Sequence, residues 1–433
     1  MNNSAYKSLR IREIVQTISL THNFDKDKLI AINTSDVYNG VMGKGTLTPV
    51  EELKGQFKKT IQKDDILFSE IRPANRRFAI VTNSDCSDFV VSTKLMVLRK
   101  FNEKVDSSYF YYCLTNQPFL DILQRRAENR IGSFPQITYD LLANYAFPIP
   151  PLKEQERISK IIANIDRKIE LNRQINDNLE AMAKQLYDYW FVQFDFPNEE
   201  GKPYKASGGA MVWNEKLKRE IPQGWHCGTL LDIAEYTNGL ACQKYRPTDN
   251  NKLPVIKIKE MHDGLSADTE WVKADIPDDV KVFDGDVLFS WSASLEVMLW
   301  AYGNGGLNQH IFKVTSKNGY PRSFYFYQLI HYVGVFKQIA EARKTTMGHI
   351  TQDHLRQSTI ALPPNIDVAN KLEEKLCPIF DAIVKNNQEI MALTKQRDEL
   401  LPLLMNGQAS VNYHLCVFQS FCILYRKQKR RME

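Results

Sequence analysis

The 433-residue sequence predicts a duplicated mixed α/β (α+β) fold: two mixed α/β units separated by two long helices that pack as an antiparallel coiled coil. Three observations predict it. Short segments recur in the same order in the two halves of the chain, which indicates an internal repeat. A long heptad pattern follows each copy, and within each copy strand-like and helix-like segments alternate.

The repeat is carried by short segments at a nearly constant spacing. The recurring pairs are Asp65–Ser69 with Asp286–Ser290, Ser108–Tyr112 with Ser323–Tyr327, and Ile137-Thr138 with Ile350-Thr351. Apolar or alternating runs typical of strands occur at 29–32, 90–98, 255–258 and 311–314, and helical spacing occurs at 109–123 and 324–340. We therefore place the parts at 1–149 (first unit), 150–195 (central helical region), 196–222 (linker), 223–362 (second unit), 363–411 (distal helical region) and 412–433 (atypical tail).

Composition narrows the class of protein. Hydrophobic residues at 43% and charged residues at 25% are ordinary globular values, so the chain should fold rather than stay disordered. No apolar run is long enough to cross a membrane and the start lacks the pattern of a signal peptide, so we expect no membrane partner and a cytoplasmic protein. Seven scattered cysteines without a CxxC pair do not predict a disulfide framework.

The two helical regions show the same seam. Apolar residues recur at alternating steps of three and four, and asparagines fill the middle of each seam. Pro150-Pro151 and Pro363-Pro364 precede the two regions. The seam residues expected to pair the helices and to dock other subunits are Ile158, Ile162, Ile165, Ile169, Asn172, Leu179, Leu186, Ile383, Asn387, Ile390, Leu393 and Leu400.

Motifs for catalysis are missing from the sequence. It contains no phosphate-binding loop, no GxGxxG after a strand, no HExxH and no Gly-x-Ser-x-Gly elbow. The eight histidines show no metal-ligand spacing, and we predict that His310 is a hydrogen-bonded structural residue. We therefore predict no catalytic residue, no metal and no cofactor bound by this chain.

Basic and amide residues instead cluster beside the repeated strands. Guanidinium groups make bidentate contacts to phosphate and to guanine, which suits nucleic-acid binding. The predicted DNA-binding residues are Arg72, Asn75, Arg76, Arg77, Arg125, Arg126, Arg130, Gln243, Lys244, Arg246, Trp291, Ser292, Arg343, Lys344 and Thr345.

Together these features resemble the specificity (S) subunit of type I restriction-modification enzymes, over about residues 7–411. The segments that carry the resemblance are 148–156 (PIPPLKEQE), 285–292 (GDVLFSWS), 307–312 (LNQHIF) and the Asn-rich helix centres. The tail departs from it, because members of the family usually end soon after a stretch like Leu400–Gln408.

The resemblance implies two target-recognition domains, each reading one half of a bipartite double-stranded DNA sequence, with the helices setting the gap between the halves. It implies docking of two modification (methyltransferase) subunits, which use S-adenosylmethionine, and of restriction subunits, which use ATP and Mg²⁺. The chain itself would be non-catalytic. Two alternatives stay open at this point: a non-specific coiled-coil adaptor and a divergent DNA-modifying enzyme.

Overall fold

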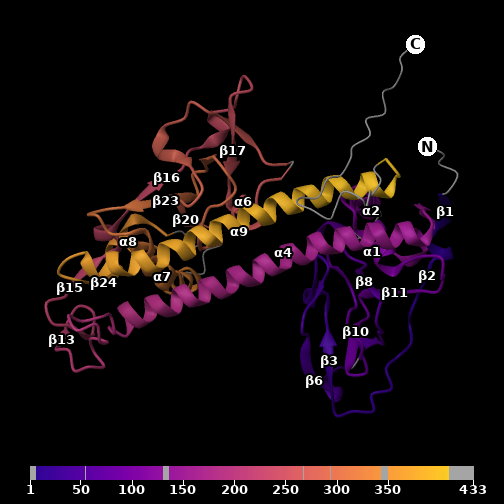
Figure 1. Cartoon of the computed structure of the whole chain (residues 1–433), viewed down its shortest axis with the longest axis horizontal. Coiled ribbons are helices and arrows are strands. Elements are labelled where there is room, and N and C mark those ends of the chain that lie inside the picture. The colour runs from indigo at the N-terminus through magenta and orange to yellow at the C-terminus, as the bar shows by residue number, and fades with distance from the viewer. Residues whose placement is uncertain are drawn as a thin grey trace. The chain divides into compact units, whose positions relative to one another are not determined.

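The computed structural model describes residues 6–53, 55–129, 136–266, 268–292, 294–342 and 350–408. The chain forms two compact units. Unit 1 comprises Met1–Arg167 with Thr394–Glu433, and unit 2 comprises Lys168–Leu393. Helix α4 (Leu152–Tyr187) begins in unit 1 and ends in unit 2, whereas α9 (Asp367–Met405) begins in unit 2 and ends in unit 1 (Figure 1). The two long predicted helices are therefore present.

Unit 1 contains two four-stranded sheets with the orders β6-β3-β10-β7 and β2-β11-β8-β9. Strands β3 and β10 pair in parallel, and the other neighbours pair antiparallel. The strands are β2 (Val15–Thr17), β3 (Lys28–Ile32), β6 (Thr46–Pro49), β7 (Phe57–Lys59), β8 (Ile66–Ser69), β9 (Phe78–Ile80), β10 (Phe89–Ser92) and β11 (Leu95–Lys100).

Unit 1 also contains two-stranded ribbons and short helices. The ribbons are β1 (Lys7–Arg10) with β12 (Ala146–Ile149) and β4 (Val37–Tyr38) with β5 (Val41–Met42); the helices are α1 (Ser107–Thr115), α2 (Gln117–Glu128) and α3 (Tyr139–Ala143). The single helix expected over 109–123 is broken at Asn116. The Asn116 side chain accepts a hydrogen bond from the Phe119 N–H at 2.9 Å, so it caps a second helix, and Pro118 fits the first turn of that helix.

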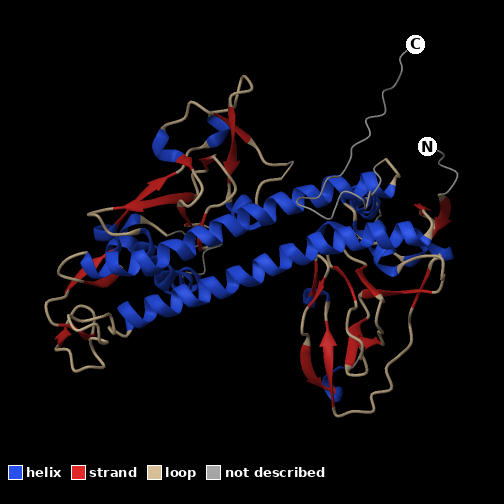
Figure 2. Cartoon of the chain, viewed as in Figure 1, coloured by secondary structure: helices blue, strands red, loops and turns tan. Residues whose placement is uncertain are grey.

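Unit 2 repeats these sheets strand for strand. Its two four-stranded sheets have the orders β18-β17-β22-β19 and β16-β23-β20-β21, again with one parallel pair, β17 with β22. The strands are β16 (Ala234–Asn238), β17 (Lys252–Ile256), β18 (Trp271–Lys273), β19 (Lys281–Val282), β20 (Val287–Ser290), β21 (Glu296–Leu299), β22 (Gly305–Leu307) and β23 (Ile311–Ser316). Figure 2 shows strands and helices combined in both units.

Other elements of unit 2 also have counterparts in unit 1. Ribbon β15 (His226–Thr229) with β24 (Thr359–Leu362) corresponds to β1 with β12, and α7 (Arg322–Ala342) follows β23 as α1 follows β11. Helices α5 (Leu230–Ile233) and α8 (Gln352–Gln357) are short. Between the first two strands of the sheet, unit 2 has helix α6 (Ile258–Asp263) where unit 1 has the β4–β5 hairpin. The predicted duplicated mixed α/β fold is confirmed.

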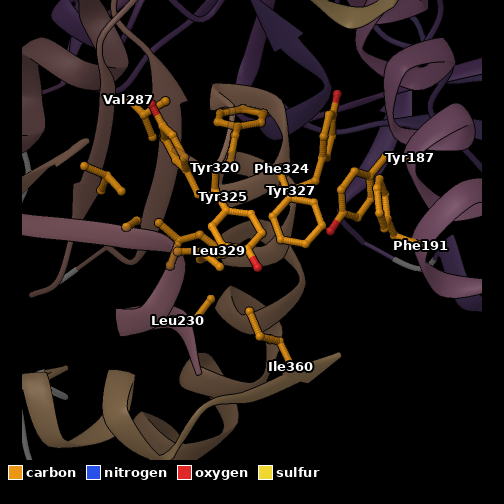
Figure 3. Close-up of a cluster of buried hydrophobic side chains, with 14 of the residues drawn as sticks. Tyr187, Phe191, Leu230, Val287, Tyr320, Phe324, Tyr325, Tyr327, Leu329 and Ile360 are labelled. Atoms are coloured by element: carbon orange, nitrogen blue, oxygen red, sulfur yellow. The ribbon is translucent and has the colours of Figure 1, made fainter. Parts of the chain in front are cut away.

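An aromatic core fixes the end of α4 within unit 2. Tyr187 stacks on Tyr327 of α7 with ring centroids 5.0 Å apart, and Phe191 meets Phe324 of α7 edge-on at 4.9 Å. Figure 3 shows these rings together with Tyr320, Tyr325 and Leu329. Such aromatic pairs stabilise beyond the area that they bury, so this helix end is firmly attached to unit 2.

Residues 196–222, expected as a linker, contain a β-hairpin and a buried side chain. Strands β13 (Met211–Asn214) and β14 (Arg219–Pro222) pair as a hairpin, and Ile221 is fully buried in the core of unit 2. Phe196 stacks between Tyr204, at 4.8 Å, and Trp225, at 5.3 Å. The Gly-rich composition serves tight turns here, because Gly201 and Gly208 adopt positive φ.

Candidate nucleic-acid interface and the helix pair

In unit 1 the segment after β8 carries three of the predicted arginines. Arg72 is exposed, and its side chain has no hydrogen bond or ion pair among the described residues; Asn75 is also exposed. Arg76 and Arg77 are half-buried and donate hydrogen bonds within the unit. The Arg76 guanidinium donates to Gln117 of α2, and Arg77 donates to the Ser35 carbonyl at 3.1 Å. Of the three, only Arg72 is open to an anionic partner.

Helix α2 brings two more predicted arginines to the same segment. The Gln124 side chain of α2 accepts a hydrogen bond from the Ala74 N–H at 3.1 Å. Arg125 and Arg126 adjoin Gln124 in the last turn of α2, where both are exposed. Arg72, Asn75, Arg125 and Arg126 are thus exposed on two segments that contact each other, and we refer to these four residues as the unit 1 basic surface.

Unit 2 places Trp291 and Ser292 at the corresponding position after β20. The Ile137 N–H donates to the Glu70 carbonyl in unit 1 at 2.7 Å, and in unit 2 the Ile350 N–H donates to the Trp291 carbonyl at 3.0 Å. The Trp291 indole donates to Asn238 at 2.9 Å, and its ring lies 5.6 Å from that of His310. Ser292 is buried. Trp291 is thus held as a half-buried platform.

The second predicted segment of unit 2 follows β16. Gln243, Lys244 and Arg246 are exposed on the loop after β16. This loop is joined to the segment that precedes β23, because the Gln309 N–H donates to the Leu240 carbonyl at 2.8 Å. Burial raises the pKa of the Cys242 thiol to about 11, which favours the protonated thiol at neutral pH.

Four predicted DNA-binding residues, Arg130, Arg343, Lys344 and Thr345, lie outside the described residues, as does the tail 412–433.

His310, expected to be structural, is half-buried beside Gln309, whose amide lies 3.3 Å from the His310 imidazole. The Nδ1 atom of His310 has no hydrogen-bond partner among the described atoms.

None of the twelve predicted seam residues is exposed. Seven are buried and five are half-buried; the buried ones are Ile158, Ile162, Ile165, Ile169, Asn172, Ile383 and Leu400, and the half-buried ones are Leu179, Leu186, Asn387, Ile390 and Leu393. This burial is what a heptad seam between packed helices requires.

An asparagine layer sets the register of the helix pair in unit 2. The Asn176 amide donates to Asn387 at 2.8 Å and accepts from Asn386 at 2.8 Å. Four residues earlier on α4, Asn172 donates to Glu389 at 2.9 Å, so the partner on α9 lies later in the chain and the helices run antiparallel. Hydrogen bonds from Lys168 and Asn172 lower the pKa of Glu389. Buried polar pairs of this kind specify register.

Unit 1 has a separate charged layer between the same two helices. Arg397 of α9 donates to Asp166 of α4 at 2.9 Å and forms an ion pair with Asp398 at 2.8 Å. The Tyr112 hydroxyl of α1 donates to the other oxygen of Asp166 at 2.9 Å. The seam pattern alone does not predict this network, although the charged Asp166 directly follows the seam residue Ile165. The network ties both helices to the unit 1 domain.

Neither a metal cluster nor a membrane span is found in the part of the chain that the structure describes. No group of three or more His, Cys, Asp or Glu side chains among these residues could hold a metal ion. None of their helices is both long and apolar enough to pass through a bilayer.

Comparison with known proteins identifies the family. A family model described as the type I restriction modification DNA specificity domain matches residues 6–181 and 222–396, once in each half. The type I restriction enzyme HindI specificity subunit of Haemophilus influenzae is 27% identical, over 94% of this chain and 100% of that protein. The MjaIX specificity subunit of Methanocaldococcus jannaschii is 26% identical, over 71% and 70%.

A solved structure has the same fold. The S subunit of a type I restriction-modification system from M. genitalium aligns with a TM-score of 0.53 and 14% identity, over 94% of this chain and 97% of that one. The family model covers most of the chain and matches it twice, in agreement with the repeated sheets. This chain belongs to the family of type I restriction-modification DNA specificity subunits.

Proposed function

We propose that the chain reads a bipartite, asymmetric DNA sequence, with unit 1 recognising one half-site and unit 2 the other. A specificity subunit is a non-catalytic, DNA-binding member of a restriction-modification complex, and the finer division of labour is what we propose here. The observation that carries it is the repetition of both four-stranded sheets in the same strand order with different exposed residues on them. Two similar scaffolds with different surfaces suit two different half-sites.

The exposed polar surfaces support this assignment. In unit 1 the basic surface of Arg72, Asn75, Arg125 and Arg126 offers guanidinium groups for phosphates and base edges. In unit 2 the exposed Gln243, Lys244 and Arg246 offer polar and basic groups, and the half-buried Trp291 offers an aromatic face. Phosphate contacts place a protein on the duplex and base contacts specify the sequence, so each unit needs both kinds.

We also propose that the helix pair docks two modification subunits and holds the readers at a fixed separation. Exposed apolar side chains support the docking: Leu171, Ile175 and Met182 lie on a face of α4 different from its buried seam, and Tyr189 lies in the π-helical turn Asp188–Val192 that follows α4. In this proposal the modification subunits supply S-adenosylmethionine and methyl transfer, the restriction subunits use ATP and Mg²⁺, and this chain contributes neither catalytic residue nor cofactor.

The proposed function is tested with the purified chain and its modification subunits. The full complex should shift duplex DNA that contains its target and methylate it, with an affinity that falls steeply as salt rises. The chain alone, given S-adenosylmethionine and magnesium, should neither methylate nor cleave. Turnover by the chain alone, or binding of the complex without sequence preference, would overturn the proposal.

Docking is tested by a charge placed on the exposed stripe. Ile175→Glu should weaken assembly with the modification subunit because it buries a charge in an apolar interface. Gln174→Glu adds the same charge one residue away on an exposed polar position and serves as the matched control. Analytical ultracentrifugation of both mixtures measures assembly. Equal assembly of the two variants would show that the stripe is not the docking surface.

A further inference from the structure

The β4–β5 hairpin of unit 1 ends in a tight turn. Its tip, Asn39-Gly40, has φ values of 45° and 97°, as a tight two-residue turn requires. Tyr38 and Val41 flank the turn as a directly paired couple, so their side chains share one face of the ribbon. Tyr38 is 54% exposed and Val41 50% exposed. The hairpin therefore presents an aromatic and an aliphatic side chain to solvent.

Two arginines hold this hairpin in place. The Asn39 N–H donates to the Arg76 carbonyl at 2.7 Å, and the Gly40 N–H donates to the Phe78 carbonyl at 2.9 Å. The Arg77 guanidinium donates to the Ser35 and Val37 carbonyls and lies 5.4 Å from the centre of the Tyr38 ring. Arg76 also bridges Asn39, at 3.4 Å, and Gln117 of α2. Both arginines are therefore committed to positioning the hairpin.

The hairpin occupies a place where the two units differ in element type. Between β17 and β18 unit 2 has α6 instead, and α6 contacts β21 through His262 and Glu296, 3.0 Å apart. In unit 1 the hairpin likewise contacts β9, through Gly40 and Phe78. Two different inserts thus rest on equivalent strands of two equivalent sheets. If the units read different half-sites, these two inserts can supply the difference in DNA specificity.

The surroundings of the hairpin suit duplex DNA. Arg76 links the hairpin to α2, whose Arg125 and Arg126 belong to the unit 1 basic surface, and Lys44 is exposed just after β5. The carboxylates of α2 are engaged locally, since Asp121 accepts from Gln117 at 2.6 Å and Glu128 from Gln124 at 2.7 Å. The major groove admits a two-stranded β-ribbon, and its thymine methyl groups favour apolar contacts.

We propose that the β4–β5 hairpin is the base-reading element of unit 1. It enters the major groove of one half-site, where Tyr38 and Val41 contact base edges. Arg72, Arg125 and Arg126 bind the flanking phosphates, and Arg76 and Arg77 are positioning residues. This inference rests on the proposed function, because it names the residues by which unit 1 discriminates its half-site.

The experiment compares methylated motifs by single-molecule sequencing of DNA treated with the complex of the full chain and its modification subunits. Tyr38→Ala and Val41→Ala should each lower discrimination at one or two base pairs of one half-site, by roughly five- to hundred-fold per position. The other half-site should keep its full specificity in the same molecules, which also shows that the variants fold. Leu47→Ala on β6, which removes a side chain 62% exposed but outside the hairpin, is the matched control.

A second experiment tests the positioning role of Arg77. Arg77→Ala should relax the same base pairs as Tyr38→Ala, and Arg77→Lys should restore part of that discrimination. Arg125→Ala should instead slow methylation of all sites alike and reduce the salt dependence of binding by about one phosphate contact. If Tyr38→Ala and Val41→Ala keep the complete wild-type motif, the hairpin does not read bases, whereas absence of any bipartite motif for the wild-type complex refutes the proposed function itself.

Discussion

The helix pair should act as a ruler between the two half-sites, and lengthening it tests this directly. The insertion points are after Arg167 in α4 and after Leu393 in α9, where the chain passes from one unit to the other. These points lie between the Asp166–Arg397 contact of unit 1 and the Lys168–Glu389 contact of unit 2, so both layers stay intact. Three heptads of seam-compatible sequence go into each helix at the same level.

The expected shift follows from helix and duplex geometry. Twenty-one residues at about 1.5 Å each lengthen each helix by about 31 Å. At about 3.4 Å per base pair, the unspecified gap should grow by about nine base pairs. That is close to one turn of DNA, about 10 base pairs, so the outer half-site again faces the protein. A single heptad should add about three base pairs, but it turns the half-site by about 100° and should methylate poorly.

The assay is methylation of a DNA library in which the two half-sites are separated by gaps of every length from three to twenty base pairs. The half-site sequences should stay unchanged, and only the preferred gap should move. Insertion into α4 alone is the control; it should lower stability and methylation because the seam loses its partner. If the lengthened protein keeps its original gap preference at full rate, the docked subunits rather than the helices set the distance.

Three further predictions concern the layers between the helices. Asn176→Ala should lower the free energy of unfolding by about 1 to 3 kcal/mol in urea titrations, because Asn386 and Asn387 lose their partner; an equal loss for the exposed control Gln174→Ala would contradict it. Arg397→Ala should lower the free energy of unfolding by about 1.5 to 3 kcal/mol, since the Arg397 side chain is only 14% exposed and pairs with Asp166. Arg397→Lys should restore only part of this stability, and full restoration would argue against a contribution from the geometry of the guanidinium group. The Lys168 and Asn172 hydrogen bonds lower the pKa of Glu389 below its usual 4.5, so the ionised Glu389 stabilises the fold above about pH 4.5, and this stabilisation is lost as pH falls through the folded-state pKa. Glu389→Gln should lower the free energy of unfolding at pH 7 by less than about 1 kcal/mol. In thermal melts, the melting temperatures of the variant and the wild type should converge near pH 3.

The sequence was most informative where a local period encodes the structure. The steps of three and four through Ile158, Ile162 and Ile165 mark one face of a helix whatever that helix contacts, and the central asparagines stand out against them. The repeated Asp-x-Leu-Phe-Ser segments located two equivalent buried strands for the same reason. Periodicity and repetition are properties of residues close together in the sequence or of matching segments, so they can be recognised without knowing the three-dimensional structure.

Long-range contacts explain what the sequence could not supply. Nothing near Arg77 in the chain indicates that its guanidinium meets carbonyls about forty positions earlier, so it looked as free as Arg72. The Gly-rich stretch after Phe196 looked like a linker because its stacking partner, Trp225, lies beyond the stretch. The break between α1 and α2 was readable, since Asn116 followed by Pro118 is a helix-start signal.

In the proposed function, one chain carries two readers for two different half-sites. Single-molecule sequencing of DNA methylated by the wild-type complex tests it most directly, when compared with a variant that replaces Gln243, Lys244 and Arg246 of unit 2 by alanine. The wild-type motif should contain two unlike specified segments separated by unspecified base pairs, and the variant should lose discrimination in one segment only. A single continuous motif, or equal loss of discrimination in both segments, would contradict the account.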